Sequence, residues 1–480
     1  MLPEIDMTSR VDLHRPILDD DIIVLIFEYA AQVDTTHYEM HISASQTCRQ
    51  WRRVALNTAA LWSRFDLVVD VRKWRQAPCV QLLQAWLARS KSCPLYFSVH
   101  FCANTLNGAA VSADPRRINN NKKEARRRET YAANVMQLLL ACQSRWREAK
   151  VLFTSTGLRK KFTAKLHDTP TLEKLEVRYN VKGAQRPLFA EGPETSLVPI
   201  YALEPRDGVV FPCLKYLDLW IPGLISTAIK SLIAVLQHTP ELRTLLVSHH
   251  TVDWRMRRAY NDLLEYPSLP HLREITWRVP SSFVRWIAHC IIVPALQELH
   301  VKATGDSPFF SVCQWLSVED NASRLTCLHL DFTWVEEWSA SDAASDARIL
   351  SRVVSLERLH LTEPFVGRDH SKGFWTQFTL PEGSDRVGTG DISCPALVFL
   401  SVKFSARVPD DYEPFARMLA SRARDERFSA LIEMSPRSNV LGLGRERMVE
   451  EAELFRAACA AIGLPVVEVD GSALQFRIPA

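Results

Sequence analysis

A short hydrophobic phrase recurs along the chain and is its most regular pattern. The phrase places apolar residues as L-x-x-L-x-L, for example at Leu172, Leu175 and Val177. Residues two apart in a β-strand point to the same face, so the second and third apolar positions face inward together. The leading leucine covers the turn that enters the strand. One unit cannot bury its apolar face alone, so the pattern predicts stacked repeats. The phrase occurs at 170–178, 212–220, 240–248, 270–278, 294–302, 323–331, 354–362 and 395–403, with a degenerate copy at 145–153.

The segments between the phrases have helical periodicity. In 226–238, Ile229, Ile233 and Leu236 recur at spacings of three and four residues, and 254–266 has a similar pattern. A chain that alternates strands with helices forms a parallel sheet, with the helices on its outer side. We therefore predict an α/β fold, namely a solenoid built from a curved parallel sheet and outer helices.

Two amphipathic segments precede this array. Residues 18–27 (LDDDIIVLIF) contain three consecutive acids, which favour a helix N-terminus, followed by apolar residues at helical spacing. Residues 43–67 also have helical character, with Trp51 on the apolar side, and this helix ends before Leu61 and Trp62. The pattern predicts a small helical unit at the N-terminal end of the array.

These two segments resemble the F-box, and particularly the fungal type that is followed by leucine-rich-like repeats. The first segment is similar to the family pattern L-P-x-E-I-L-x-x-I-F, with Asp19 at the position of the family's proline. The second is similar to V-C-R-x-W-R-x-I-A followed by T-P-x-L-W, with Ala59 at that second proline. The array in turn resembles leucine-rich repeats with uneven intervals. The matching residues are Leu18, Asp21, Ile22, Ile23, Ile26 and Phe27, then Cys48, Arg49, Trp51, Arg52, Val54, Ala55, Thr58, Leu61 and Trp62.

The resemblance implies a protein partner. F-box helices insert apolar side chains into a groove of a Skp-type adaptor, which attaches to a cullin–RING ubiquitin ligase of the SCF type. A physical argument points the same way, because a helical unit of about 50 residues forms little core alone and leaves apolar surface for a partner. The alternative is that these residues only pack onto the first repeat. The predicted adaptor-binding residues are Leu18, Ile22, Ile23, Ile26, Phe27, Cys48, Trp51, Leu61 and Trp62.

Composition narrows the class of protein. The chain has 480 residues, of which 47% are hydrophobic and 24% charged, as is ordinary for a globular protein with more than one core. A net charge of +3 argues against a dedicated nucleic-acid-binding or membrane-binding protein. The apolar runs are far shorter than the roughly 20 residues that cross a bilayer, and no secretory signal is recognisable. Eleven scattered cysteines indicate reduced thiols, so we expect a cytoplasmic and/or nuclear protein.

The remaining segments complete the predicted organisation. The basic block 116–128 is interpreted as a solvated loop leading into a helix, with nuclear import or nucleic-acid binding as alternatives. Asp470-Gly471 predicts the turn of a closing hairpin over 465–479, which would cap the array. We expect an F-box-like helical domain at 1–66, a linker with the first irregular repeats at 67–144, and a leucine-rich-repeat-like solenoid with a C-terminal cap at 145–480.

The sequence contains no familiar catalytic motif. A P-loop, HExxH, GxSxG and an EF-hand loop are all missing from it, so we predict a protein that is not an enzyme and needs no cofactor. A hydrolase or transferase with a dispersed site is the distant alternative. If the phrases stack in register, His300, His329 and His360 lie on three successive strands, about 4.8 Å apart, with Cys327 on the same face. Such a ladder could bind zinc or sense pH, but we interpret these as surface histidines and assign no metal.

The face that carries this ladder is rich in mixed charge and in aromatic residues. Exposed Tyr, Trp and Arg are common hot spots, and mixed charge suits a protein client better than a polyanion. We therefore predict a substrate-recognition adaptor of an SCF-type ubiquitin ligase, whose repeats bind a protein client. The alternative is a non-ligase repeat scaffold in which the N-terminal helices only cap the array. The predicted client-binding residues are Tyr216, Trp220, Arg278, His300, His329 and His360.

Overall fold

The computed structural model divides the chain into two compact units, Met1–Ala149 and Lys150–Ala480. It describes residues 18–33, 40–70, 79–102, 115–153, 169–179, 211–221, 232–249, 267–280, 283–284, 287, 290–304, 312, 315–316, 323–334, 350, 353–362, 371–380, 394–404, 412–434, 444–470 and 474–478. The domain boundaries that the sequence suggests at residues 66 and 144 stay predictions.

The first unit begins with helices and then alternates helices with strands. Its elements are α1 (Asp20–Val33), α2 (Met40–Thr47), α3 (Arg49–Asn57), the 3-10 helix η1 (Ala59–Trp62), β1 (Arg64–Asp70), α4 (Cys79–Arg89), β2 (Leu95–Cys102), α5 (Pro115–Leu140), the 3-10 helix η3 (Gln143–Arg145) and the start of β3 (Trp146–Phe153).

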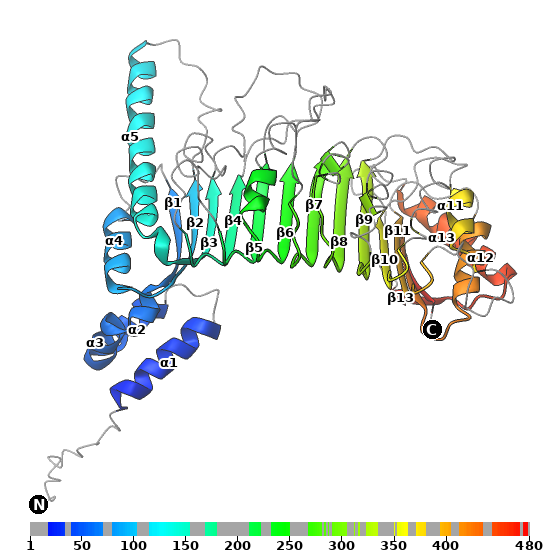
Figure 1. The fold of residues 1–480 in the computed structure, drawn as a ribbon, viewed down its shortest axis with the longest axis horizontal. Helices are drawn as coiled ribbons and strands as arrows, with labels where there is room; N and C mark the ends of the chain where they lie inside the picture. The colour runs from blue at the N-terminus through cyan, green and yellow to red at the C-terminus, as the bar shows by residue number, and fades with distance from the viewer. Residues whose placement is uncertain are drawn as a thin grey trace, which may run out of the picture. The chain divides into compact units, whose positions relative to one another are not determined.

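The second unit is dominated by strands (Figure 1). Its further elements are β4 (Lys174–Tyr179), β5 (Tyr216–Ile221), β6 (Thr244–His249), β7 (Glu274–Pro280), β8 (Glu298–Thr304), β9 (Cys327–Trp334), β10 (Arg358–Thr362), α11 (Ser371–Phe378), β11 (Phe399–Phe404), α12 (Glu413–Arg422), β12 (Ser429–Met434), α13 (Gly444–Ala461), β13 (Val467–Asp470) and β14 (Leu474–Ile478).

The strands follow one another in the sheet in nearly the same order as in the chain. In the first unit β1 lies beside β2, and in the second unit the order is β4 to β12, then β14 and β13. From β4 to β12 every neighbouring pair is parallel, whereas β14 is antiparallel to both β12 and β13. The fold is therefore α/β with a long, mostly parallel sheet, consistent with a solenoid-like repeat. The predicted closing hairpin is confirmed by the antiparallel pairing of β13 with β14, whose turn lies outside the described residues.

The recurring phrase forms the core as its pattern predicts. Leu172, Leu175 and Val177 are all buried, and the corresponding residues of the later copies are exposed by 3% or less. The leading leucine also closes the entering turn, since the amide of Leu172 donates to the carbonyl of Thr169 at 3.2 Å. Proline, whose fixed φ suits the second position of such a turn, occupies it at Pro170. The same turn recurs at Leu214, Leu242, Leu272, Leu296, Leu356 and Leu397.

One local prediction is wrong. The basic block 116–128 lies inside α5, which runs from Pro115 to Leu140, so it is helical and not a loop. The reason is that lysine, arginine, glutamate and alanine are strong helix formers, and proline is favoured in the first turn. Of the helices predicted between the phrases, residues 232–237 are helical, and 254–266 lie outside the described residues.

Large aromatic side chains hold the C-terminal helices of the second unit to its sheet. Phe415 of α12 lies 4.4 Å from Trp375 of α11 and 6.0 Å from Phe404 of β11, measured between ring centroids. Phe455 of α13 lies 5.4 Å from Phe476 of β14. These contacts cover one face of the last strands. In the part of the chain that the structure describes, no helix combines the length and apolarity needed to cross a membrane.

Candidate functional site

The start of α1 is fixed by its own acidic residues. The amide of Asp21 donates to Oδ1 of Asp19 at 3.1 Å, and the amide of Ile23 donates to the Asp19 carbonyl at 3.1 Å. Asp19 is therefore the N-cap of α1, because its side chain satisfies one of the unpaired amides of the first turn. The acidic run that precedes the apolar residues thus sets where the helix begins.

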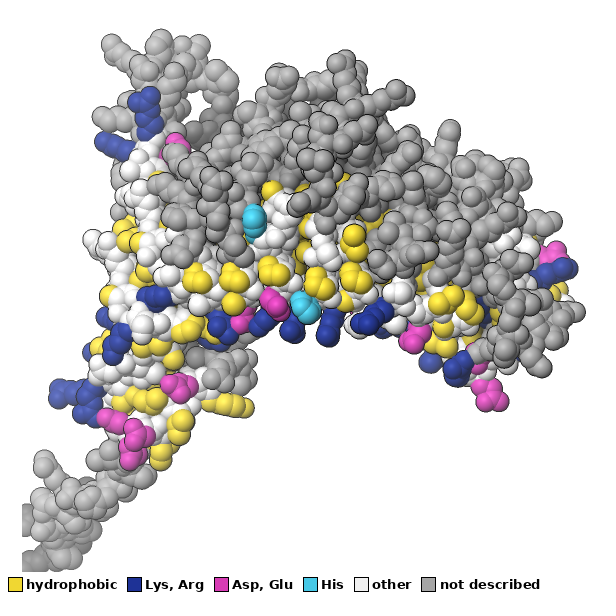
Figure 2. Space-filling model, in the orientation of Figure 1, with side chains coloured by type: hydrophobic (Ala, Val, Ile, Leu, Met, Phe, Trp, Pro, Cys, Tyr) yellow, Lys and Arg dark blue, Asp and Glu magenta, His cyan; other side chains and the backbone are white. Residues whose placement is uncertain are grey.

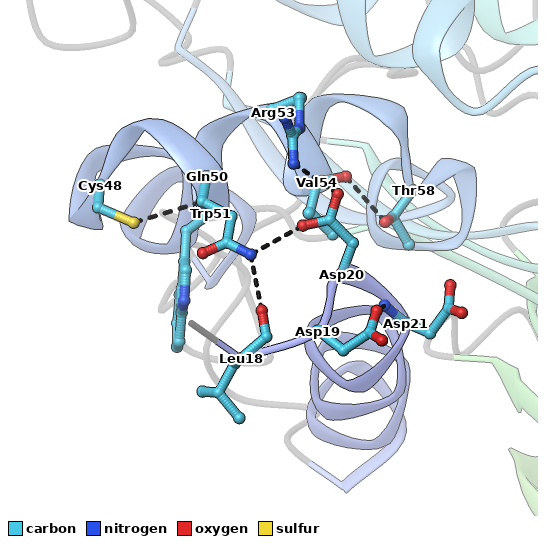
Figure 3. A network of polar contacts seen from close by, with 10 residues as sticks. All are labelled: Leu18, Asp19, Asp20, Asp21, Cys48, Gln50, Trp51, Arg53, Val54 and Thr58. Carbon is cyan, nitrogen blue, oxygen red and sulfur yellow. Dashed lines mark hydrogen bonds and ion pairs between the residues drawn. The ribbon is translucent and has the colours of Figure 1, made fainter. Parts of the chain in front are cut away.

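A polar network joins this helix start to α3 (Figure 3). Nε2 of Gln50 donates to the carbonyl of Leu18 at 2.7 Å and to Oδ1 of Asp20 at 2.9 Å. Nη2 of Arg53 donates to Oδ2 of Asp20 at 2.6 Å. The hydrogen bond from Gln50, helped by the Arg53 guanidinium and opposed by partial desolvation, lowers the pKa of Asp20. The network fixes the entry of the chain into α1 against α3.

One face of α1 packs inside the helical unit. Ile23 and Phe27 are fully buried, and the Phe27 ring meets Trp51 of α3 edge to face, with 5.2 Å between ring centroids. Cys48, which is exposed, is the N-cap of α3, where its Sγ accepts from the amide of Trp51 at 3.4 Å. Ile23 and Phe27 are therefore core residues of this unit, and Trp51 supports them from α3.

The residues that follow α3 are also buried. Leu61 and Trp62 of η1 are buried, and Nε1 of Trp62 donates to the carbonyl of Ala55 at 2.7 Å. The guanidinium of Arg89, from α4, lies 4.4 Å from the Trp62 ring centroid. Thr58, between α3 and η1, donates its hydroxyl to the carbonyl of Val54 at 2.9 Å. Trp62 therefore links η1 to both α3 and α4, and together these contacts brace the helical unit.

The opposite face of α1 presents a row of exposed apolar side chains, which we call the α1 stripe. Leu25 and Tyr29 are 64% and 69% exposed, and Ile22 is 47% exposed. Positions 22, 25 and 29 follow the spacing of three and four residues that places side chains on one face of a helix, and Leu18 immediately precedes the N-cap of α1. Figure 2 shows hydrophobic side chains on the surface of this helical region, beside acidic ones. The α1 stripe consists of Leu18, Ile22, Leu25, Ile26 and Tyr29.

The sequence prediction covers only part of this stripe. Leu18, Ile22 and Ile26 are predicted contacts that lie on it, whereas Leu25 and Tyr29 are not among the predicted residues. The spacing of Leu25 and Tyr29 from Leu18 and Ile22 is the signal that could have found them. An exposed apolar row of this kind on a small helical unit is a candidate surface for contact with another macromolecule.

A family comparison agrees with this geometry. Residues 20–68 match the model of the family described as F-box-like. This span contains an F-box-like domain. The match covers α1, α2, α3, η1 and most of β1, so the α1 stripe, the Gln50 network and the two tryptophans all belong to the F-box-like domain, except that Leu18 lies just before it.

The whole chain was also compared with solved structures. A solved structure described as the crystal structure of the Rad7 and Elc1 complex in yeast aligns with 80% of this chain and 88% of its own, at 12% identity and a TM-score of 0.34. A search of curated proteins gave no significant sequence match.

The second unit presents a polar face opposite the buried leucines. The pairing register places the predicted client-binding positions on this one face, because Tyr216, Arg278 and His300 share the alternation phase of their strands. Tyr216 is half-buried, with Nζ of Lys174 4.8 Å from its ring centroid, and Arg278 is exposed. Trp220 lies in β5, but its side chain is outside what the structure describes.

The predicted histidine ladder forms on this face. His300 of β8, His329 of β9 and His360 of β10 are direct neighbours in the sheet. Their rings stack, with centroids 4.2 Å apart between His300 and His329 and 3.7 Å apart between His329 and His360. Cys327, on the same face of β9, is buried. The in-register arrangement that the sequence predicts is therefore confirmed.

Burial makes His329 and His360 weak bases. Desolvation, together with the neighbouring His360, His300 and Arg358, lowers the pKa of His329 to about 3. Desolvation, Arg358 and His300 lower the pKa of His360 to about 4. Burial raises the pKa of the Cys327 thiol, with Arg358 opposing this shift. At neutral pH both imidazoles are therefore uncharged, which allows the rings to stack without charge repulsion.

Proposed function

We propose that this protein is a substrate-recognition adaptor of an SCF-type ubiquitin ligase, in which the F-box-like domain binds a Skp-type adaptor. The observation that carries the proposal is the α1 stripe, an exposed apolar row on a helix within a domain that matches the F-box-like family. Ile23 and Phe27 support this surface because both are buried in the helical unit, where Phe27 packs on Trp51, and the stripe therefore faces outward.

The direct contacts proposed here are fewer than the residues that the sequence suggests. Leu18, Ile22 and Ile26 keep the role of adaptor contacts, joined by Leu25 and Tyr29. The other predicted residues support this surface instead. Ile23, Phe27, Leu61 and Trp62 are buried, Trp51 packs on Phe27, and Cys48 caps α3.

The second unit is proposed to hold a protein client on its polar face. Arg278 is exposed there, and Tyr216 and the histidine ladder are half-buried, which is the mixture of aromatic and charged side chains found at protein interfaces. We further propose that the protein is not itself an enzyme and that it works in the cytoplasm or the nucleus, where the ligase and its clients would be met.

Co-purification of the full chain with a Skp-type adaptor tests the first part. The informative variant is Leu25→Asp, because Leu25 is 64% exposed and its replacement leaves the core of the domain intact. A charge at the centre of a hydrophobic interface costs several kcal/mol, so the variant should lose about a hundredfold or more in affinity. Ile22→Asp should behave in the same way.

Leu454→Asp is the matched control. Leu454 is also a helical leucine, 57% exposed, but it lies on α13 of the second unit. It should leave adaptor binding unchanged. Wild-type protein that is folded and binds no Skp-type adaptor, or Leu25→Asp and Leu454→Asp proteins that bind equally, would refute the proposal and leave a repeat scaffold.

The client surface has its own test. Arg278→Glu reverses an exposed charge on the polar face, whereas Arg417→Glu reverses an exposed charge on α12. Client proteins whose ubiquitination requires the wild-type chain should no longer be ubiquitinated in the presence of Arg278→Glu. They should still be ubiquitinated in the presence of Arg417→Glu. Equal behaviour of the two variants would remove Arg278 from the proposed client surface.

A further inference from the structure

A cluster of soft ligand atoms lies on the polar face of the second unit. Sγ of Cys327 and one ring nitrogen each of His329 and His360 all lie within 4.8 Å of one another. Cys327 and His329 are two residues apart on β9 and share one face, while His360 pairs directly with His329 across to β10. Three residues from two neighbouring strands therefore converge on one point of the sheet.

We propose that Cys327, His329 and His360 bind a divalent transition-metal ion, with Zn²⁺ as the occupant. One thiolate and two imidazoles form a donor set that zinc prefers over hard-ligand cations such as Mg²⁺ and Ca²⁺. Three protein ligands leave a fourth coordination position for water or for a group of a bound molecule. The proposal does not depend on the adaptor function, because it concerns only atoms of β9 and β10.

The arrangement requires only small movements to form the site. Bonds of about 2.3 Å to sulfur and 2.1 Å to nitrogen, in tetrahedral geometry, place ligand atoms about 3.3–3.6 Å apart. The rings of His329 and His360 are nearly parallel, at 8°, so one ring must rotate about its Cβ–Cγ bond for both to point at one ion. That torsion has a broad energy minimum, and the strands themselves need not move.

Binding of the ion requires a proton to leave the cluster. A cysteine coordinates zinc as the thiolate, so the Cys327 thiol must lose its proton when the ion binds. Zn²⁺ binding therefore releases one proton and weakens in acid.

Charged neighbours balance one another around the cluster. Glu298 pairs with Cys327 in the strand register and forms an ion pair of 3.1 Å with Arg358. Glu298 also lies 3.7 Å from Nε2 of His300, and Lys302 forms an ion pair of 2.8 Å with Asp331. The Arg358 charge, which would repel a cation, is thus partly neutralised by Glu298.

Cobalt titration of the full chain tests the proposal. Co²⁺ occupies zinc sites and gives an intense thiolate-to-metal absorption band when a cysteine is a ligand. After treatment with a chelator, the wild-type protein should bind one equivalent of Co²⁺ with this band, and Zn²⁺ should abolish it by displacement. Zn²⁺ should also raise the melting temperature of the protein, since a ligand that binds only the folded state stabilises it.

Variants of the ligands sharpen the test. Cys327→Ser should remove the band, and His360→Asn should weaken Co²⁺ binding at least about a hundredfold, since even outer-shell changes cost about 10- to 100-fold. Cys290→Ser is the matched control, because Cys290 is also a buried cysteine of this unit. It should keep the band and the affinity.

Three results would overturn the proposal: a folded wild-type protein that shows no cobalt band, a band that survives Cys327→Ser, or equal effects of His360→Asn and Cys290→Ser. If Cys327→Ser does not fold, the histidine variants decide the test. His329 and His360 are half-buried, so His329→Asn and His360→Asn alter the surface and leave the leucine core in place.

Discussion

The F-box-like domain and the sheet of the second unit use apolar residues in opposite ways. In the sheet, every phrase buries its three apolar positions, and Leu299 and Leu328 have no exposed surface at all. In α1, fully buried Ile23 and Phe27 stand next to Ile22 and Leu25, which are 47% and 64% exposed. A stacked repeat covers its apolar face with the next repeat, whereas a helical domain of this size has too little interior for all its apolar residues.

The two units therefore differ in the surface that they expose. The repeats of the sheet bury the apolar positions of the phrase and present polar side chains and the histidine ladder on one face. The F-box-like domain keeps an apolar row exposed, and the proposed adaptor contact rests on this row. Substitutions that separate core from surface test this contrast.

The largest expected effect is in the core of the F-box-like domain. Phe27→Ala removes a fully buried ring and its edge-to-face contact with Trp51, so it should destabilise the domain by about 3–5 kcal/mol. Urea denaturation of the full chain measures this as an early transition absent from the wild type. Ile22→Ala, on the exposed stripe of the same helix, should change stability by less than about 0.5 kcal/mol. Equal losses would show that the two faces of α1 do not differ.

The next effect is in the sheet. Leu328→Ala on β9 opens a cavity among the stacked leucines, and the expected loss is about 2–5 kcal/mol of the free energy of unfolding. Arg324→Ala, in the turn that precedes the same strand, is exposed and should lie within about 0.5 kcal/mol of the wild type. The denaturation midpoints of the two variants provide the comparison. A mild Leu328→Ala variant would contradict the buried-phrase interpretation.

A smaller effect is expected at the start of α1. Asp19→Ala removes the side chain that accepts from the Asp21 amide, and loss of an N-cap costs about 0.5–2 kcal/mol. Asp19→Asn can accept the same hydrogen bond and should retain most of this stability. Thermal unfolding followed by circular dichroism distinguishes them. If the alanine and asparagine variants melt together, the cap contributes nothing.

The smallest effect concerns acid. The pKa of Asp20 is lowered in the folded protein by its hydrogen bond from Gln50 and by Arg53, so its ionised form favours the folded state. Its contribution is present above its ordinary pKa of 3.8 and is lost as the pH falls below that value toward the lowered pKa. The hydrogen-exchange protection factor at the first turn of α1, which corrects the observed rate for the intrinsic rate at each pH, should fall over this range in the wild type, and Asp20→Asn should remove this fall. A wild-type protection factor that does not change with pH would contradict the role of the network.

The repeating core could be predicted from the sequence because its signal is periodic. Leu175 and Val177 alternate as a strand requires, and the same spacing returns in each copy. The spacing was therefore enough to predict the buried face shared by the strands and the in-register histidine ladder. The helical identity of 116–128 did not follow, since a dense basic run is typical of both a solvated loop and an exposed helix.

The division of α1 into a buried and an exposed face required the tertiary structure. Two rows of α1 are apolar at helical spacing, one at positions 23 and 27 and the other at positions 22, 25 and 29, so periodicity alone does not say which row packs inward. The orientation of α1 decides which row is buried. It is set by the contacts of Gln50 and Arg53 with the start of α1 and by the packing of Trp51 on Phe27. The sequence by itself determined that α1 is an apolar helix and that the phrases form a stacked sheet, because both depend on local periodicity. Which side chains stay exposed, and how closely Cys327, His329 and His360 approach, depends on contacts between residues distant in the chain, and only the folded structure decides it.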